Sequence, residues 1–257
     1  MKYIKYDVKE RIAYITLARA EKRNALNDHV VEELSNYFGK AEVDPEVKVV
    51  ILRAEGKVFC AGADLGYLQQ LQKNNFEENL EDSSKLKDLF LKIYTLKKVV
   101  IAQIQGHAIA GGCGLAAVCD FAFTVPEAKF GYSEVKIGFI PAIVMVFLIR
   151  KIGDGRSREL LLGGNLINSK IAMHYGVINW VVEEDSLEKE VYNFASNLIS
   201  KNSAQSLQYT KEMLSNVQNM NLNESLDYAA RMNAEARESK DCKRGIMAFL
   251  NKEEIMW

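Results

Sequence analysis

The sequence contains few of the residues that build metal centres, disulfide frameworks or linkers. Its 257 residues include only four cysteines, three histidines and three prolines. The cysteines (Cys60, Cys113, Cys119 and Cys242) form no CxxC pair and have no histidines at zinc-ligand spacing. We therefore expect neither a metal site nor structural disulfides, and a reducing compartment in which the cysteines are small core residues.

Neither sign of charge dominates the chain, and no apolar run is long. Lys and Arg total 33 against 34 Asp and Glu, whereas a general nucleic-acid binder needs an excess of basic groups. The most apolar stretch, residues 137–149, contains Pro141 and is too short to cross a bilayer. The N-terminus alternates apolar and polar residues, unlike a signal peptide. We expect a cytoplasmic protein without nucleic-acid or membrane partners.

The first part of the chain has an α/β pattern. Residues 3–8 and 12–17 alternate as two strands, and Asn27 is placed to cap a helix with apolar residues at helical spacing. The short apolar runs 47–53 and 99–105 predict buried strands. Strands alternating with helices imply βαβ units with right-handed crossovers.

After Gly153 the pattern becomes mainly helical. No low-complexity linker or internal repeat separates this part from the α/β core, and only residues 178–182 resemble a strand. The predicted helices span residues 156–162, 169–175, 187–201, 204–217, 222–238 and 242–250.

Two turns of small residues each follow a predicted strand and lead into a helix. They span residues 58–65 (VFCAGADL) and 106–115 (GHAIAGGCGL). Their glycine spacing fits neither a dinucleotide-binding fingerprint nor a P-loop. A helix start leaves backbone N–H groups without partners, so two such starts facing each other would aim two donors at one oxygen.

Two further motifs, Glu21–Asn27 (EKRNALN) and Ala128–Pro141, lie on either side of Phe59–Asp64 (FCAGAD) and Gly106–Asp120. Together the four motifs make the chain resemble the crotonase family, the enoyl-CoA hydratases and isomerases. The resemblance covers nearly the whole chain and implies an α/β superhelix of ββα repeats over residues 1–195. A helical trimerisation region would follow over 196–257, in a homotrimer or homohexamer.

The resemblance also implies catalytic roles. The backbone N–H groups of Ala63 and Gly111 correspond to the donors of the family's oxyanion hole, which stabilises a thioester enolate. Glu134 corresponds to the carboxylate that exchanges protons with the substrate's carbon skeleton. The family's other catalytic carboxylate would lie where this chain has Gly114.

The missing carboxylate leaves several activities open. The segment 131–142 resembles methylglutaconyl-CoA-type hydratases, which favours reversible hydration of a 2-enoyl-CoA as the leading function. A single carboxylate is sufficient to move a proton between two carbons, which favours Δ3–Δ2 enoyl-CoA isomerisation as the first alternative. Decarboxylation of an acyl-CoA is a third. An alternative of another class is a non-catalytic assembly or RNA-associated protein, against which the near-neutral charge and Glu134 argue.

No cofactor is expected beyond the coenzyme A moiety of the acyl-CoA substrate. The resemblance places Lys22 and Arg23 near the coenzyme A phosphates. In the family, the Phe and Lys that match Phe249 and Lys252 reach a neighbouring subunit's ligand. The family's basic tail is replaced here by Glu253–Trp257. The full set expected to bind coenzyme A is Lys22, Arg23, Ala25, Ala61, Asp64, Phe249 and Lys252.

A few other polar residues near these motifs have simpler interpretations. Asp64 is suited to cap the helix that follows it, and His107 to a structural role. Tyr67 and Leu68 are candidates to line the acyl pocket. Glu81 or Asp82 could replace the missing carboxylate, although acids on such a helix mostly face water.

Overall fold

The structure, a computed structural model, describes residues 3–257 and contains two β-sheets. In the six-stranded sheet, β1 and β2 are antiparallel and the other neighbours are parallel. In the four-stranded sheet, only the edge strand β9 is antiparallel. The larger sheet has the order β1 (Ile4–Lys9), β2 (Ile12–Leu17), β3 (Val49–Ala54), β5 (Val99–Ile104), β7 (Phe121–Thr124) and β10 (Trp180–Val181). The smaller has β4 (Val58–Cys60), β6 (His107–Ile109), β8 (Lys129–Gly131) and β9 (Ile167–Asn168).

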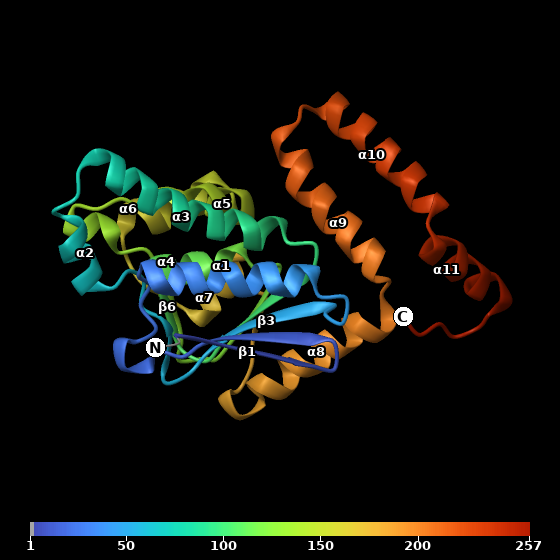
Figure 1. Ribbon diagram of the computed structural model, residues 1–257, viewed down its shortest axis with the longest axis horizontal. Helices are drawn as coiled ribbons and strands as arrows, with labels where there is room; N and C mark the ends of the chain where they lie inside the picture. Colours follow the sequence, from blue (N-terminus) through green and yellow to red (C-terminus); the bar gives the residue numbers. More distant parts are fainter. Residues whose placement is uncertain (1–2) are drawn as a thin grey trace.

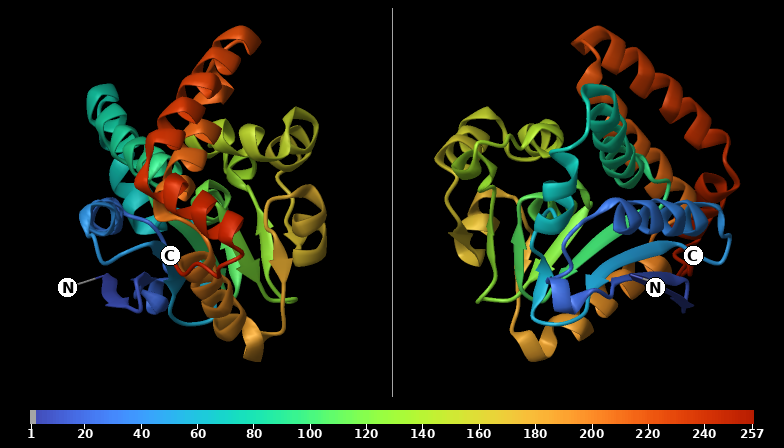
Figure 2. Two further views of the ribbon diagram at one scale, coloured as in Figure 1. Left: turned by 90° about the vertical axis from the view of Figure 1, so that its right-hand side faces the viewer. Right: turned by 60° about the vertical axis from the view of Figure 1, so that its left-hand side comes forward.

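Helices surround the sheets, with α1 and α8 on opposite faces of the larger one (Figures 1 and 2). The helices are α1 (Asp28–Val43), α2 (Leu65–Leu71), α3 (Phe76–Thr95), α4 (Gly111–Val118), α5 (Ala142–Ile152), α6 (Asp154–Gly163), α7 (Ser169–Tyr175), α8 (Leu187–Lys201), α9 (Ala204–Asn216), α10 (Leu222–Glu238) and α11 (Lys240–Asn251). Short 3₁₀ turns are η1 (Ala20–Lys22), η2 (Glu134–Ile137), η3 (Glu184–Ser186) and η4 (Val217–Asn219).

The core forms where the parallel strands are covered on both faces. Residues 49–52 of β3 and 99–102 of β5 are buried throughout, as expected for strands inside an α/β sheet. On the covering helix α1, Leu34 and Phe38 are fully buried. The side chain of Asn27 accepts a hydrogen bond from the N–H of Val30, which confirms the predicted cap.

The last three helices extend away from the α/β body (Figure 1, orange to red). The predicted domain boundary at residue 195 lies inside α8, which continues to Lys201. Because Leu187, Val191 and Ala195 of α8 are buried against the sheet, α8 belongs to the body and the projecting part begins at α9.

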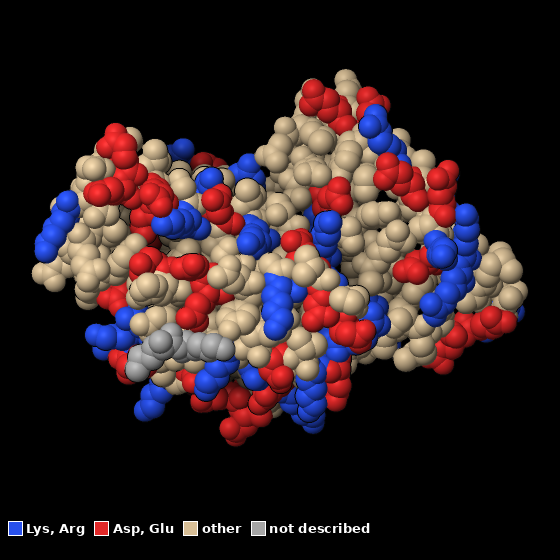
Figure 3. Space-filling view, in the orientation of Figure 1, with Lys and Arg blue, Asp and Glu red and all other residues tan. Residues whose placement is uncertain are grey.

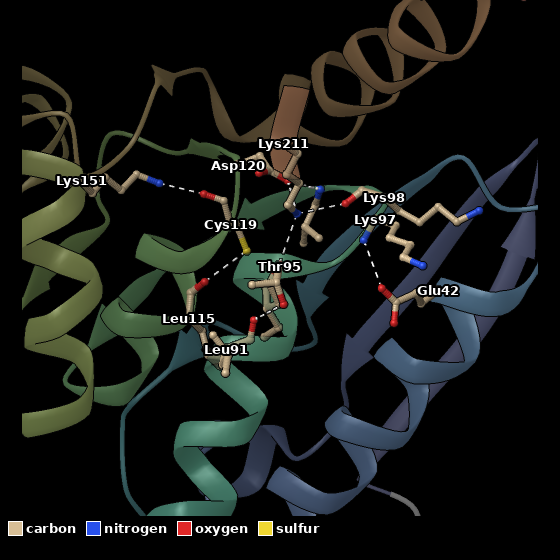
Figure 4. A network of polar contacts seen from close by, with 12 residues as sticks. Glu42, Leu91, Thr95, Lys97, Lys98, Leu115, Cys119, Asp120, Lys151 and Lys211 are labelled. Atoms are coloured by element: carbon tan, nitrogen blue, oxygen red, sulfur yellow. Dashed lines mark hydrogen bonds and ion pairs between the residues drawn. The ribbon is translucent and has the colours of Figure 1, made fainter. Parts of the chain in front are cut away.

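A buried lysine joins α9 to the body (Figure 4). The ammonium of Lys211 lies 2.7 Å from Oδ2 of Asp120 and donates to the carbonyls of Ile93 (3.2 Å) and Lys98 (3.0 Å). The same Asp120 oxygen accepts from the N–H of Val100 at 2.7 Å. The last turn of α3, the start of β5 and the residue before β7 are therefore tied to one point on α9.

Acidic and basic side chains are interspersed over the face shown in Figure 3, in line with the net charge of −1. Within residues 3–257, no helix combines the length and the apolar character needed to cross a membrane.

Candidate active site

The turn that carries Ala63 is held to the end of the first motif by a parallel bridge. The N–H of Leu26 donates to the carbonyl of Gly62, and the N–H of Asp64 donates to the carbonyl of Leu26, both at 2.8 Å. The N–H of Ala63 itself has no acceptor among residues 3–257, and Ala63 is exposed. Its N–H group is therefore free to donate to a ligand.

The turn that carries Gly111 contains an unusual backbone conformation. Ala110 has φ 53° and ψ −124°, a region that costs a non-glycine residue about 1–3 kcal/mol. Its N–H donates to the carbonyl of Gly131 at 2.8 Å, which fixes this conformation. Gly111 then begins α4, and its N–H has no acceptor in the described part of the chain.

The two turns are in contact, as the sequence predicted for two facing helix starts. Gly62 has φ +89°, and a Cβ added to it would lie 2.7 Å from Cβ of Ala110 and 3.6 Å from the nitrogen of Gly111. Only glycine fits at this approach. The contact places Ala63 and Gly111 on neighbouring turns, each with an N–H group that has no acceptor among residues 3–257. A two-donor oxyanion hole would require such a pair of free donors.

Glu134 lies beside the first turn of α4. It begins η2, three residues after Gly131, whose carbonyl holds Ala110. Burial raises the pKa of its carboxyl, and Oε2 is buried without a hydrogen-bond partner among the described residues. Burial also raises the pKa of the Cys113 thiol to about 11 and that of Tyr132, and the charge of Glu134 adds to both shifts. An unpartnered carboxylate oxygen of raised pKa is suited to accept and return a proton.

Gly114, where the family's second carboxylate would lie, is enclosed by carbon. It is buried one turn into α4, with its N–H bonded to the carbonyl of Ala110 at 3.0 Å. A Cβ at Gly114 would lie 2.3 Å from Cγ1 of Val144 on α5 and 2.8 Å from Cε1 of Phe90 on α3. No side chain fits at this position without displacing its neighbours.

Asp64 is the N-cap of α2, which confirms its predicted capping role. Its carboxylate accepts from the N–H groups of Gly66 (2.8 Å) and Tyr67 (3.2 Å) and pairs with Arg19 at 2.7 Å. Partial burial opposes ionisation of Asp64, but the hydrogen bonds from Arg19 and the two N–H groups outweigh it and lower the pKa. The sequence pattern did not reveal this ion pair, which fixes the residue next to Ala63.

The two acids considered as replacements for the missing carboxylate have other partners. The hydroxyl of Tyr67 donates to Oδ1 of Asp82, which joins α2 to α3. Glu81 is exposed and pairs with Lys85 one turn along α3, at 2.9 Å. Tyr67 therefore points toward α3, while Leu68 is half-buried beside it.

The residues expected near the coenzyme A phosphates lie on an exposed turn. Lys22 and Arg23 are exposed, and Arg23 adopts a left-handed conformation with φ 53°. The carbonyl of Arg23 accepts from the N–H of Ala61 at 3.1 Å, which places the two motifs side by side. Ala25 is buried next to this turn.

Asn24 anchors this turn, a role that the sequence analysis missed. It is 1% exposed with φ 53°, and its side-chain nitrogen donates to the carbonyls of Glu55 and Val58, both at 2.8 Å. Asparagine tolerates the left-handed conformation better than most residues, which is the one signal in the sequence that suggested such a turn.

Phe249 and Lys252 lie far from the chain's own site. Phe249 is 83% exposed on α11, and Lys252 follows that helix in a left-handed conformation. Figure 1 shows α11 and α2 at opposite ends of the molecule's long axis. Within one chain, these two residues are not brought together with Ala63, Gly111 and Glu134.

His107 has the structural contact expected of it. Its Nδ1 accepts from the N–H of Lys129 at 3.2 Å, across the neighbouring strands β6 and β8. Across residues 3–257, no group of His, Cys, Asp and Glu side chains is arranged to hold a metal ion.

Comparison with known sequences gives a family match over nearly the whole chain. The model of the family described as enoyl-CoA hydratase/isomerase matches residues 7–257. The chain belongs to this family. It is 38% identical over 244 residues to a Thermus thermophilus protein provisionally named an enoyl-CoA hydratase, covering 95% of this chain and 96% of the relative. It is 32% identical over 249 residues to the crotonyl-CoA hydratase of Syntrophomonas wolfei, covering 95% and 93%.

The fold comparison gives the same result. A crystal structure of an enoyl-CoA hydratase from Mycobacterium smegmatis superposes with a TM-score of 0.94 at 28% identity, covering all of this chain and 99% of the other. The predicted fold, the crotonase-type α/β superhelix with a helical C-terminal region, is confirmed.

Proposed function

We propose that this chain catalyses the reversible addition of water to the 2,3 double bond of an enoyl-CoA thioester, with Glu134 as its acid–base group. The observation that carries the proposal is the half-buried Glu134, whose Oε2 has no partner within residues 3–257. Glu134 lies three residues after Gly131, whose carbonyl is hydrogen-bonded to Ala110, the residue before Gly111. The enoyl-CoA hydratase names of its relatives support the substrate class.

The proposed mechanism follows from the free donors and the free carboxylate. The thioester oxygen accepts hydrogen bonds from the N–H groups of Ala63 and Gly111, which stabilise the negative charge that develops on it as the enolate forms. Water adds its oxygen to C3 while Glu134 takes one of its protons, and Glu134 then returns a proton to C2. Losing one oxyanion donor typically lowers such a rate by about 10²–10³.

The coenzyme A moiety would bind along the turn that contains Lys22 and Arg23. Both side chains are exposed and basic, and the hydrogen bond between Arg23 and Ala61 connects their turn to the one that carries Ala63. A phosphate group at this turn would receive charge-assisted hydrogen bonds.

The direct test is incubation with crotonyl-CoA, 3-methylglutaconyl-CoA and 3-hexenoyl-CoA, with products identified by mass. A product heavier by one water from either 2-enoyl substrate is the expected result. The 3-methylglutaconyl substrate also tests the predicted subgroup. No turnover of any of the three, together with no acyl-CoA binding by calorimetry, would leave the non-catalytic alternative.

Glu134→Gln separates the chemistry from binding. We expect the variant to lose about 10²–10⁴ in kcat with little change in acyl-CoA affinity, since an amide cannot exchange the proton. Glu134 must be ionised to act as a base, and burial raises the pKa of its carboxyl above the ordinary value of 4.5. Wild-type kcat/KM should therefore rise with pH, with the midpoint of the rise above pH 4.5. An active Glu134→Gln variant would refute the role of this residue.

Isomerisation of a 3-enoyl-CoA to a 2-enoyl-CoA is the second candidate. The carbon-lined surroundings of Gly114 favour it, because moving a proton between two carbons needs one carboxylate and no positioned water. Conversion of 3-hexenoyl-CoA without a gain of water would select this activity over hydration.

The exposed apolar side chains of the C-terminal helices support a homotrimer or homohexamer. Leu222 and Leu226 of α10 and Ile246, Phe249 and Leu250 of α11 are each more than half exposed. Apolar surface of this kind is typically covered by a partner. In an assembly, Phe249 and Lys252 would be able to reach another subunit's ligand. Light scattering should give a mass of three or six chains.

A further inference from the structure

Gly114 is packed closely against Val144 and Phe90. Gly114 is the only residue of α4 at which the family's catalytic pattern calls for a carboxylate, and its neighbours leave no room for one. The constraint comes from two other helices, because the nearest atoms belong to Val144 on α5 and Phe90 on α3.

Both neighbours are fixed in the core. Phe90 is fully buried and Val144 is 4% exposed. The ring of Phe90 lies 6.0 Å from that of Phe147, which in turn lies 5.3 Å from that of Tyr94. The ring of Phe90 is therefore fully buried and packed against Phe147, which is itself packed against Tyr94, so Phe90 has little space into which to move. Close-packed cores of this kind resist added volume.

The location makes this packing relevant to chemistry. Gly114 lies one helical turn after Gly111, the proposed donor. The first turn of the same helix contains Cys113, and the charge of Glu134 adds to the rise in the pKa of its thiol. The three atoms nearest to a Cβ added at Gly114 are all carbon, so none of them could form a hydrogen bond with a water molecule.

We infer that Val144 and Phe90 are specificity-determining residues: by filling the space beside Gly114 with carbon, they exclude a second acid and its water at this position and leave proton transfer to Glu134. This inference rests on the proposed function. It means that water activation limits hydration in this site, and that the ratio of hydration to isomerisation depends on the size of residue 144.

The packing itself is tested without any assay of activity. Gly114→Ala should lower Tm by about 4–10 °C, because the added methyl group overlaps Val144. Gly39→Ala is the matched control, since Gly39 is also helical but its nearest neighbour to an added Cβ is 3.7 Å away. It should leave Tm unchanged or raise it. When Val144 is already replaced by glycine, adding Gly114→Ala should lower Tm by less than half as much as Gly114→Ala lowers the Tm of wild type.

The chemical consequence is tested in the variant Gly114→Glu/Val144→Gly, which offers a second carboxylate and the space for it. We expect hydration of crotonyl-CoA, relative to isomerisation of 3-hexenoyl-CoA, to increase about tenfold or more over the Val144→Gly single variant. An unchanged ratio in a folded double variant that still binds acyl-CoA would overturn the specificity role.

A failure of the packing inference and a failure of the proposed function give different results. If Gly114→Ala and Gly114→Glu are as stable as wild type, the packing constraint is wrong whatever the enzyme does. If the Tm coupling is found but wild type turns over no acyl-CoA, the packing stands and the proposed function is wrong.

Discussion

The two backbone N–H groups proposed as donors lie at the starts of two helices that are held in opposite ways. The helix that follows Ala63, α2, has no buried residue. In α4, which begins at Gly111, every residue from Gly112 to Val118 is buried. One half of the predicted oxyanion hole thus adjoins a helix that is held by polar contacts, and the other half adjoins a helix that is held by the packing of the core.

The polar contacts of α2 are few and specific. Asp64 caps the helix and pairs with Arg19, and Tyr67 is bonded to Asp82 of α3. By contrast, α4 is surrounded by apolar neighbours, and just beyond its last turn the carbonyl of Cys119 accepts from the partly buried Lys151 at 2.8 Å. We therefore expect changes near α4 to lower stability first, and changes near α2 to lower activity more than stability.

The largest effect is expected from Gly112→Ala on the buried side. An added Cβ would lie 2.2 Å from the carbonyl oxygen of Cys60, a backbone atom that cannot move without disturbing β4. We expect a loss of about 3 kcal/mol or more in the free energy of unfolding, measured in urea, or failure to fold. The Gly39→Ala variant is again the control. Wild-type stability of Gly112→Ala would contradict the close packing of α4 on β4.

A smaller loss of stability and a larger loss of activity are expected from Asp64→Ala on the exposed side. Removing the cap costs about 1–2 kcal/mol, while the turn that carries Ala63 loses its link to Arg19. We expect kcat/KM to fall about tenfold or more, a loss of donor geometry that the modest change in stability cannot explain.

The control for Asp64→Ala is Asp154→Ala. Asp154 also pairs with an arginine, Arg158, at 2.7 Å, but both side chains are about two-thirds exposed. Its loss should cost well under 1 kcal/mol and leave activity unchanged. If the two variants reduce activity equally, the ion pair of Asp64 does not position the site.

Much of the fold could be predicted because its elements have strong local patterns. The predicted helices 169–175, 187–201 and 222–238 coincide with α7, α8 and α10. The strands β4, β6 and β8 have three residues each, too few to show alternation, and they were not predicted. The helix α5 was also missed, because its residues are apolar on nearly every side.

In the site, the sequence predicted features that lie within one segment, but it did not reveal contacts between segments that are distant in the chain. The contact between Gly62 and the turn of Gly111 was anticipated from two local motifs. The packing of Val144 on Gly114 joins residues thirty positions apart and has no local pattern. The pairing of Arg19 with Asp64 depends in the same way on the fold that brings them together.

The smallest effect, and the sharpest test of the comparison, is expected from Tyr67→Phe. The change removes one hydroxyl that is bonded to Asp82 and leaves the ring in place. Because Tyr67 is only partly buried, the loss of this hydrogen bond should cost about 0.5–1.5 kcal/mol. If the bond holds α2, and through it Ala63, the variant should show a several-fold lower kcat with a nearly unchanged KM, since the donor acts on charge that develops only in the transition state.

Tyr175→Phe provides the matched control for this change. Its hydroxyl is also bonded to a carboxylate, that of Glu159, at 2.7 Å, but it joins α7 to α6. Both variants lose a tyrosine–carboxylate hydrogen bond, so they should lose similar stability, while only Tyr67→Phe should lower kcat. If kcat is unchanged in both, α2 is held without Tyr67, and the Asp64–Arg19 pair alone positions the exposed donor. If Tyr67→Phe raises KM instead, the residue contributes to ground-state binding, and the donor on the exposed side is more rigid than its few contacts imply.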